Sequence, residues 1–120
     1  TSDIISLHTN LNHSSRHIID KQFIDDCKKS FYLINTARGE CISNDDLIHG
    51  LESGKILGAG LDVLENENKD FEGIEVDQNL DKLKKFENVI LTPHIAGWSN
   101  ESKIKLAQIT VDKIKEFLDL

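Results

Sequence analysis

The side chains of this sequence that could do chemistry stand just after its apolar runs. They are one arginine, one histidine and three acidic residues: Arg38, His94, Asp62, Glu65 and Glu67. An arginine binds a carboxylate or phosphate through two parallel hydrogen bonds, and an imidazole beside a carboxylate can give and take a proton near neutral pH. If the fold brings these groups together, they form an anion-binding site beside an acid–base pair.

His94 follows the only proline of the chain, Pro93, in the stretch NVILTPHIAGW (residues 88–98). Because proline lacks a backbone N–H, it cannot lie inside the hydrogen-bond ladder of a sheet. The apolar run Val89–Leu91 should therefore form a buried strand that stops at Thr92. The next side chain to project from the end of that strand is the imidazole of His94.

Apolar runs alternate along the chain with stretches of helical character. The predicted strands are Asp3–Leu7, Phe31–Asn35, Ile56–Val63 and a run that ends at Thr92. The predicted helices are Asp20–Lys29 with Asp20 as N-cap, Asn44–Ser53 with Gly54 as its stop, a short helix near Leu80–Lys85, and a long helix capped by Ser99. Successive strand ends lie roughly 30 residues apart, the length of a strand–helix–strand unit. The pattern predicts an α/β fold, a doubly wound parallel sheet of the Rossmann-like kind.

A parallel sheet built from such apolar strands should be covered by helices on both faces. The carboxyl ends of its strands lie at one edge, where doubly wound folds bind their ligands. The residues just past those ends then become neighbours, whatever their separation in sequence. They are His8 and Thr9, then Thr36, Ala37, Arg38 and Gly39, then Asp62 with Glu65 and Glu67, and finally His94.

Composition and charge exclude several classes of protein. The 120 residues are 38% hydrophobic and 29% charged, which is typical of one globular domain or a part of one. A net charge of −7 argues against a nucleic-acid or anionic-membrane surface, and no apolar run approaches the length of a membrane span. Cys27 and Cys41 are too few for a disulfide framework and lack metal-ligand spacing. We therefore expect reduced thiols, no metal site and a cytoplasmic protein.

Four stretches resemble one protein family in the family's order and spacing: SLHTNLNHSSRHII, LINTARGECI, GKILGAGLDVL and ILTPHIAGW. They are similar to the D-isomer-specific 2-hydroxyacid dehydrogenases, which include phosphoglycerate dehydrogenases. The resemblance implies that residues 1–98 are the C-terminal part of an NAD-binding domain and that residues 99–120 are a helix returning toward a substrate domain. It implies that the family's GxGxxG turn lies upstream of Thr1, because Gly58 and Gly60 lack the third glycine. We therefore expect a partial domain that lacks its N-terminal half and is inactive by itself.

The resemblance also implies roles for single residues. Arg38 matches the arginine that binds the substrate carboxylate, and His94 matches the catalytic acid–base. Glu67 matches the carboxylate that orients this histidine and favours its protonated form. Asp62 matches the residue that binds the nicotinamide carboxamide. The cofactor-binding set implied in this way is His8, Thr9, Thr36, Ala37, Arg38, Asp62, His94 and Gly97.

The implied activity is hydride transfer between NAD(H) and a pair of D-2-hydroxy acid and 2-oxoacid, with 3-phosphoglycerate as one candidate substrate. The implied partners are this small molecule and, for the full-length protein, a second copy in a homodimer, with neither nucleic acid nor membrane. One alternative is a dinucleotide-binding corepressor-like member of the family without dehydrogenase activity. An unrelated response-regulator-like module is disfavoured, because it needs an acidic pocket after the first strand, where this sequence has His8 and Thr9.

Single residues remain ambiguous when each is taken alone. Arg38 could be a surface arginine and His94 could be structural. Only the register of the family motif selects Glu67 over Glu65. Trp98 could line the substrate pocket or pack under the following helix. No role is assigned to the remaining histidines, His13, His17 and His49.

Overall fold

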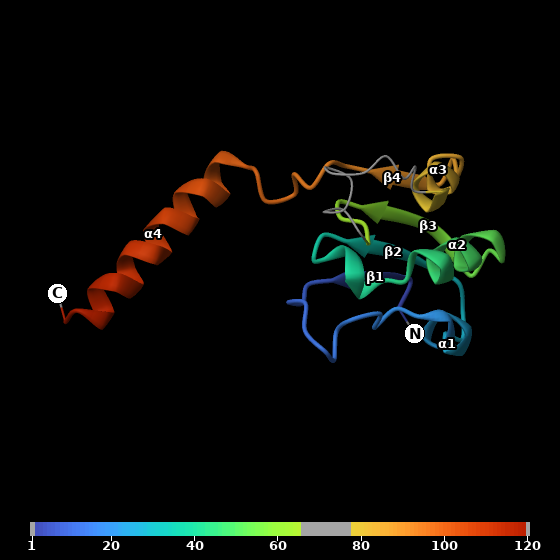
Figure 1. Cartoon of the computed structure of the whole chain (residues 1–120), viewed down its shortest axis with the longest axis horizontal. Helices are drawn as coiled ribbons and strands as arrows, with labels where there is room; N and C mark the ends of the chain where they lie inside the picture. Colours follow the sequence, from blue (N-terminus) through green and yellow to red (C-terminus); the bar gives the residue numbers. More distant parts are fainter. Residues whose placement is uncertain (1, 66–77, 120) are drawn as a thin grey trace.

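The computed structural model describes residues 2–65 and 78–119. Within these ranges the chain forms a parallel four-stranded sheet, three helices packed on it, and a fourth helix beyond it (Figure 1). The strands are β1 (Ile4–Leu7), β2 (Phe31–Asn35), β3 (Ile56–Leu61) and β4 (Val89–Leu91). The helices are α1 (Lys21–Asp26), the short 3-10 turn η1 (Gly39–Cys41), α2 (Asn44–Glu52), α3 (Gln78–Leu83) and α4 (Asn100–Phe117).

The sheet confirms the predicted α/β fold. Its strands lie in the order β1-β2-β3-β4 and every neighbouring pair is parallel. β2 has the bounds that the sequence predicts, whereas β3 ends at Leu61 and not at Val63. The reason is that Leu61 makes the last pairing with β4, opposite Leu91, and the chain bends at Asp62.

Polar side chains cap the helices. Asp20 accepts a hydrogen bond from the backbone N–H of Phe23 at 2.8 Å and so begins α1, as predicted. Ser99 caps α4 in the same way, also as predicted. α1 ends at Asp26, three residues before the predicted end, because Cys27 has an extended backbone (φ −60°, ψ 123°).

The hydrophobic core lies between the sheet and the three helices α1, α2 and α3. Side chains alternate along β2, so that Phe31 and Leu33 point into the core while Tyr32 and Ile34 point away from it. The helices contribute buried side chains of their own to this core: Ile24, Leu47, Ile48, Leu51 and Leu83. Burial of this face supplies most of the driving force that holds the strands in register.

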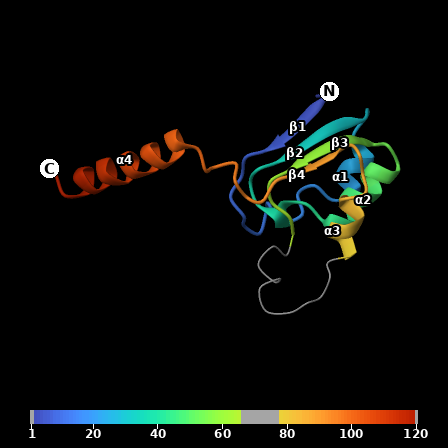
Figure 2. The ribbon, with the colours of Figure 1, turned by 90° about the horizontal axis from the view of Figure 1, so that it is seen from above.

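The expectation of helices on both faces is wrong for the described residues. α1, α2 and α3 all lie on the same face of the sheet (Figure 2). On the other face Ile4, Tyr32 and Ile90 are 57%, 51% and 70% exposed. Connections between parallel strands are right-handed, so a strand order that advances in one direction places every crossing helix on one side. A second covered face would require a reversal of strand order, which the order β1-β2-β3-β4 does not contain.

α4 extends away from the sheet (Figures 1 and 2), and none of its residues is buried. Trp98, which precedes it, is 69% exposed, so the alternative that Trp98 packs under this helix is wrong for the described structure. No helix in the described ranges has the length and apolar composition needed to cross a membrane.

Gly39 lies where two distant segments of the backbone meet. A Cβ atom at this position would lie 1.9 Å from the carbonyl oxygen of Leu64 and 2.6 Å from the backbone nitrogen of Glu65. Only glycine allows the turn after β2 to pack so closely against the segment after β3. The two segments therefore form a single packed unit at the carboxyl edge of the sheet.

Replacing Gly39 by alanine should lower the free energy of unfolding by on the order of 2 kcal/mol, because the clash is with backbone and not with a side chain that can rotate. Gly97→Ala is the matched control, since a Cβ atom at Gly97 meets nothing within 4 Å. Its stability should change by less than about 0.5 kcal/mol. Urea unfolding followed by circular dichroism measures both variants, and equal stabilities would contradict the close packing at Gly39.

Candidate functional site

An open pocket of about 470 Å³ lies at the carboxyl edge of the sheet, on its uncovered side. Its wall is mostly apolar, with Ile34, Ile90 and Ile95 among the lining side chains. Thr36 and Asp62 are polar members of the same wall. The pocket therefore joins residues that follow β2, β3 and β4, as a parallel sheet requires.

Asp62 holds the segment that carries His94. Its buried carboxylate accepts hydrogen bonds from Thr92 Oγ1 at 2.5 Å, from the backbone N–H of Ile95 at 2.8 Å and from that of Ala96 at 2.9 Å. Its backbone carbonyl accepts a fourth bond, from the N–H of His94, at 2.9 Å. One aspartate after β3 thus fixes the conformation of the turn after β4.

His94 has a left-handed backbone, with φ at 54°, which few residues other than glycine adopt. Its N–H also lies 3.0 Å from the carbonyl oxygen of Thr92, which closes a three-residue turn around Pro93. The ring of Pro93 fixes a φ suited to such a turn, so this proline both ends the strand and directs the chain back. A left-handed histidine persists only where its surroundings determine it, and such residues gather at functional sites.

The pKa of Asp62 lies below its ordinary value of 3.8. Burial by itself would raise this pKa, but the hydrogen bonds from Thr92, Ala96 and Ile95, together with the nearby His94, outweigh burial. Asp62 is therefore charged at neutral pH. A carboxyl group whose pKa is lowered by folding stabilises the folded state above its unfolded pKa, and this contribution is lost as the pH falls through the folded pKa.

Arg38 follows β2 on a turn that the buried side chain of Asn35 organises. Asn35 Nδ2 donates to the carbonyl oxygen of Arg38 at 3.0 Å, and Asn35 Oδ1 accepts from the N–H of Ala37 at 3.0 Å. The carbonyl oxygen of Asn35 also accepts from the N–H of Asp62 at 2.9 Å, which ties the arginine turn to the segment after β3. The guanidinium of Arg38 is exposed and donates to the carbonyl oxygen of Ala37 at 2.6 Å.

Asn35 escaped the sequence analysis, which treated it only as the last residue of a strand. A signal was present, because a polar residue at the buried end of an apolar run needs hydrogen-bond partners. Asparagine can satisfy this need by bonding the backbone two or three residues further on. The residue type and its place before Thr36 thus indicated an ordered turn.

The other described residues implied by the family motif lie at the same edge with different degrees of burial. Ala37 is buried, whereas His8 is exposed and forms a hydrogen bond of 2.8 Å between its Nε2 and Ser6 Oγ. Gly97 is exposed, one turn beyond His94. β2 and β3 separate His8 and Thr9 from the end of β4. Glu67 lies outside the described residues.

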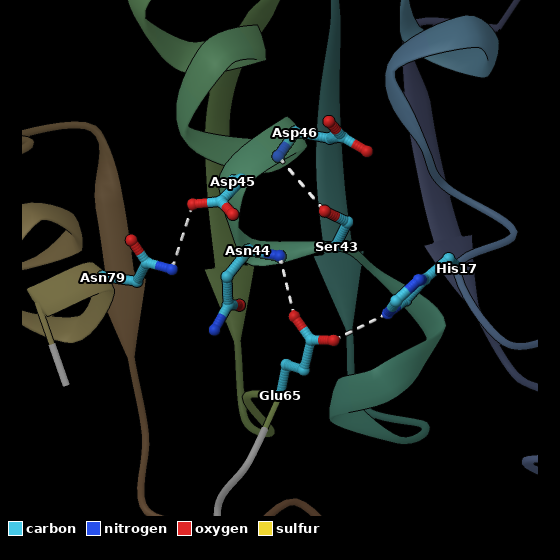
Figure 3. Close-up of polar contacts among 7 residues, drawn as sticks. All are labelled: His17, Ser43, Asn44, Asp45, Asp46, Glu65 and Asn79. Atoms are coloured by element: carbon cyan, nitrogen blue, oxygen red, sulfur yellow. Dashed lines mark hydrogen bonds and ion pairs between the residues drawn. The ribbon is translucent and has the colours of Figure 1, made fainter. Parts of the chain in front are cut away.

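His17, which the sequence analysis left without a role, meets Glu65 beside this edge. His17 Nε2 lies 2.6 Å from Glu65 Oε1, and the N–H of Asn44 donates to Glu65 Oε2 at 3.1 Å (Figure 3). Both carboxylate oxygens of Glu65 are therefore engaged, which disfavours its use as the substitute for Glu67. No sequence pattern pairs residues that lie 48 positions apart, so this contact had no signal in the sequence.

The pocket fits part of a dinucleotide site. Its apolar walls suit a flat ring, and its position at the carboxyl edge is where doubly wound sheets bind nucleotides. Gly58 and Gly60 lie inside β3 and not at a turn between a strand and a helix, so they cannot form the phosphate-binding glycine turn. The described residues accordingly suit the nicotinamide end of a cofactor better than its pyrophosphate.

Comparison with known proteins identifies the family to which these features belong. The family model described as the NAD binding domain of D-isomer specific 2-hydroxyacid dehydrogenase matches residues 1–96. The chain belongs to this family. Membership accounts for the four sequence motifs and for the parallel sheet that carries them, and NAD is the cofactor of the matched domain.

Relatives and solved structures agree with this assignment. The chain is 40% identical to an aromatic 2-oxoacid reductase of Clostridium sporogenes, over 97% of this chain and 37% of the relative. It is 40% identical to a D-lactate dehydrogenase of Staphylococcus aureus, over 89% of this chain and 34% of the relative. The NAD-complexed D-isomer specific 2-hydroxyacid dehydrogenase from Lactobacillus delbrueckii ssp. bulgaricus superposes with a TM-score of 0.82 at 36% identity, over 98% of this chain and 38% of that one. The chain thus spans less than two fifths of the length of these proteins.

Asp62→Asn should loosen the turn that carries His94, because an amide nitrogen would face a backbone N–H where a carboxylate oxygen now accepts. The protection of the Ile95 and Ala96 amides against hydrogen exchange should fall by about tenfold or more. Asp26→Asn, at an exposed aspartate at the end of α1, is the control and should leave both amides unchanged.

Acid should reproduce this effect without any substitution. Protection of the same two amides should be constant between about pH 7 and pH 5 and should decline as the pH falls through the lowered pKa of Asp62, below 3.8. Protection that declined already above pH 5 would contradict a low pKa for this carboxyl group.

Proposed function

We propose that the full-length protein carrying this chain is an NAD-dependent dehydrogenase that interconverts a 2-oxoacid and a D-2-hydroxy acid. The observation that carries the proposal is the turn held by Asp62, which presents His94 at the same sheet edge as Arg38. Membership of the family supports it further. On the resemblance of their motifs, Arg38 is proposed to be the substrate-binding arginine and His94 the acid–base histidine.

The proposed substrate is a 2-oxoacid without a phosphate group. The relatives named for aromatic 2-oxoacids and for D-lactate support this class, and their names lend no support to 3-phosphoglycerate. What such substrates share is a carboxylate beside a carbonyl group. Arg38 can bind that carboxylate through two parallel N–H···O bonds, and its positive charge also polarises the carbonyl.

His94 is proposed to move the proton. When bound, NADH supplies the hydride that adds to C2 of the oxoacid. His94 gives its proton to the carbonyl oxygen, which becomes the hydroxyl group, and takes the proton back in the oxidation direction. Glu67, outside the described residues, is proposed to orient the imidazole and to favour its protonated form.

The remaining residues of the set are proposed to line the cofactor. Among the described residues, Asp62 Oδ2 accepts one hydrogen bond, from the N–H of Ala96, and it is proposed to accept also from the carboxamide N–H of nicotinamide. The other residues proposed to contact the dinucleotide are His8, Thr9, Thr36, Ala37 and Gly97. A homodimer is proposed on the family resemblance alone, and a cytoplasmic location on the small number of cysteines. The corepressor-like alternative would need the cofactor site but not His94, and no described feature favours it.

Arg38→Lys in the full-length protein should raise the Michaelis constant for the oxoacid and lower kcat by on the order of tenfold or more, since lysine keeps the charge but loses the two-pronged geometry. The affinity for NADH should change little. Arg16→Lys, at an exposed arginine in the loop before α1, serves as the control. Steady-state kinetics measure both variants. If Arg38→Lys weakened NADH binding and left the oxoacid constants alone, Arg38 would belong to the cofactor site instead.

His94→Ala should lower the rate of oxoacid reduction by roughly two to four powers of ten, the range usual for loss of a general acid. Glu67→Gln should keep the imidazole but weaken its hold on the proton, so that the rate falls away at lower pH than in the unmodified enzyme. The double variant should be little worse than His94→Ala, because Glu67 acts through the ring. Profiles of kcat/KM against pH for the four proteins decide this, and an unchanged profile in Glu67→Gln removes Glu67 from the mechanism.

A further inference from the structure

The pair His17–Glu65 joins three segments of the chain at the edge that carries the proposed site. We propose that His17 and Glu65 are positioning residues that fix the turn of Arg38 for binding the substrate carboxylate. This inference rests on the proposed function of Arg38. Neither residue is placed against substrate or cofactor, so their effect on the reaction acts through Arg38.

The side chains of the pair make the first link. Glu65 lies between His17 and the N-terminal end of α2 (Figure 3). Its Oε1 is 2.6 Å from His17 Nε2, and its Oε2 accepts from the N–H of Asn44 at 3.1 Å. The Glu65 side chain is only 19% exposed, so water competes weakly for these contacts. The pair therefore connects three parts of the chain: the loop before α1, the start of α2 and the segment that follows β3.

The backbones of the same two residues also contact the turn that carries Arg38. The N–H of His17 donates to the carbonyl oxygen of Glu40 at 2.8 Å. In addition, Gly39 packs directly on the backbone of Leu64 and Glu65. Arg38 immediately precedes these two contact points. The side-chain contact between His17 and Glu65 joins these two backbone contacts to each other, so that a displacement of the turn would strain it.

The backbone of His17 supports this interpretation. Its φ is 51°, in the left-handed region that disfavours residues other than glycine. Such a conformation persists where surrounding contacts determine it. The contacts that determine it are the bond to Glu40 and the bond to Glu65. His17 and His94 thus both have a left-handed backbone, and both lie beside the same edge of the sheet.

Glu65→Ala in the full-length protein should show whether the pair positions Arg38 for substrate binding or only stabilises the fold. It removes both side-chain contacts and leaves the guanidinium of Arg38 intact. The Michaelis constant for the oxoacid should rise, and binding of oxamate, an unreactive 2-oxoacid analogue, should weaken, each by about five- to twentyfold. NADH binding should stay within about twofold. Glu52→Ala, at an exposed glutamate at the end of α2, is the matched control and should change neither.

The histidine offers a test by rescue. His17→Gln places an amide nitrogen near the position of Nε2, where it can still donate to Glu65, whereas His17→Ala cannot. In His17→Gln, the affinity for oxamate should stay within about threefold of that of the unmodified protein. In His17→Ala, the affinity for oxamate should fall as far as it does in Glu65→Ala. His13→Ala, an exposed histidine on the same loop, is the control. Equal losses in His17→Gln and His17→Ala would overturn the donor role of the imidazole.

Two further measurements distinguish a failure of this inference from a failure of the proposed function. Glu65→Ala should speed hydrogen exchange at the amides of Cys41 and Ile42, which donate to Arg38 and Gly39 within the turn. Combined with Arg38→Lys, it should weaken oxamate binding by less than the product of the single effects. A lowered melting temperature with unchanged exchange and unchanged oxamate binding would overturn the inference, because the pair would then only secure α2. If the unmodified protein reduced no 2-oxoacid, the proposed function would fail, and the exchange at Cys41 and Ile42 would still decide whether the pair holds the turn.

Discussion

The buried carboxylate of Asp62 is the interaction on which the site depends. Three hydrogen bonds from one short turn converge on it, and they lower its pKa despite burial. A charged acceptor inside a protein is stable only when such donors surround it, so the turn and the charge stabilise each other. The left-handed backbone of His94 follows from this arrangement, because the turn must present its N–H groups inward to Asp62 while the imidazole stays at the surface.

The arginine turn obeys a different constraint, the close approach of two backbones. Gly39 has no Cβ and so lets the segment after β2 touch Leu64. Asn35 satisfies the polar groups that this approach buries. The turn that carries Arg38 is therefore held mostly by backbone contacts and by the buried side chain of Asn35, while Arg38 itself stays exposed. Such construction on rigid strand ends is how parallel sheets place chemically active groups from distant segments within reach of one ligand.

The uncovered face of the sheet is a consequence of the strand order. Because connections between parallel strands are right-handed as a rule, a strand order that advances in one direction places the described helices α1, α2 and α3 on one face. Apolar side chains such as Ile4 and Ile90 remain exposed on the other face. The pocket lies on this second side, so its apolar walls are part of the same surface. The chain spans less than two fifths of the length of the relatives and solved structures to which it is similar.

The sequence by itself determined the features that depend on neighbouring residues. The strand Phe31–Asn35, the caps Asp20 and Ser99, and the placement of Arg38 and His94 after strand ends all follow from local pattern and from the missing N–H of Pro93. Only the tertiary structure decided which face of the sheet is covered, which turn Asp62 holds, and that His17 meets Glu65. These contacts join segments tens of residues apart, and their geometry is set by the handedness of crossovers and by close backbone packing, which leave no periodic mark in the sequence.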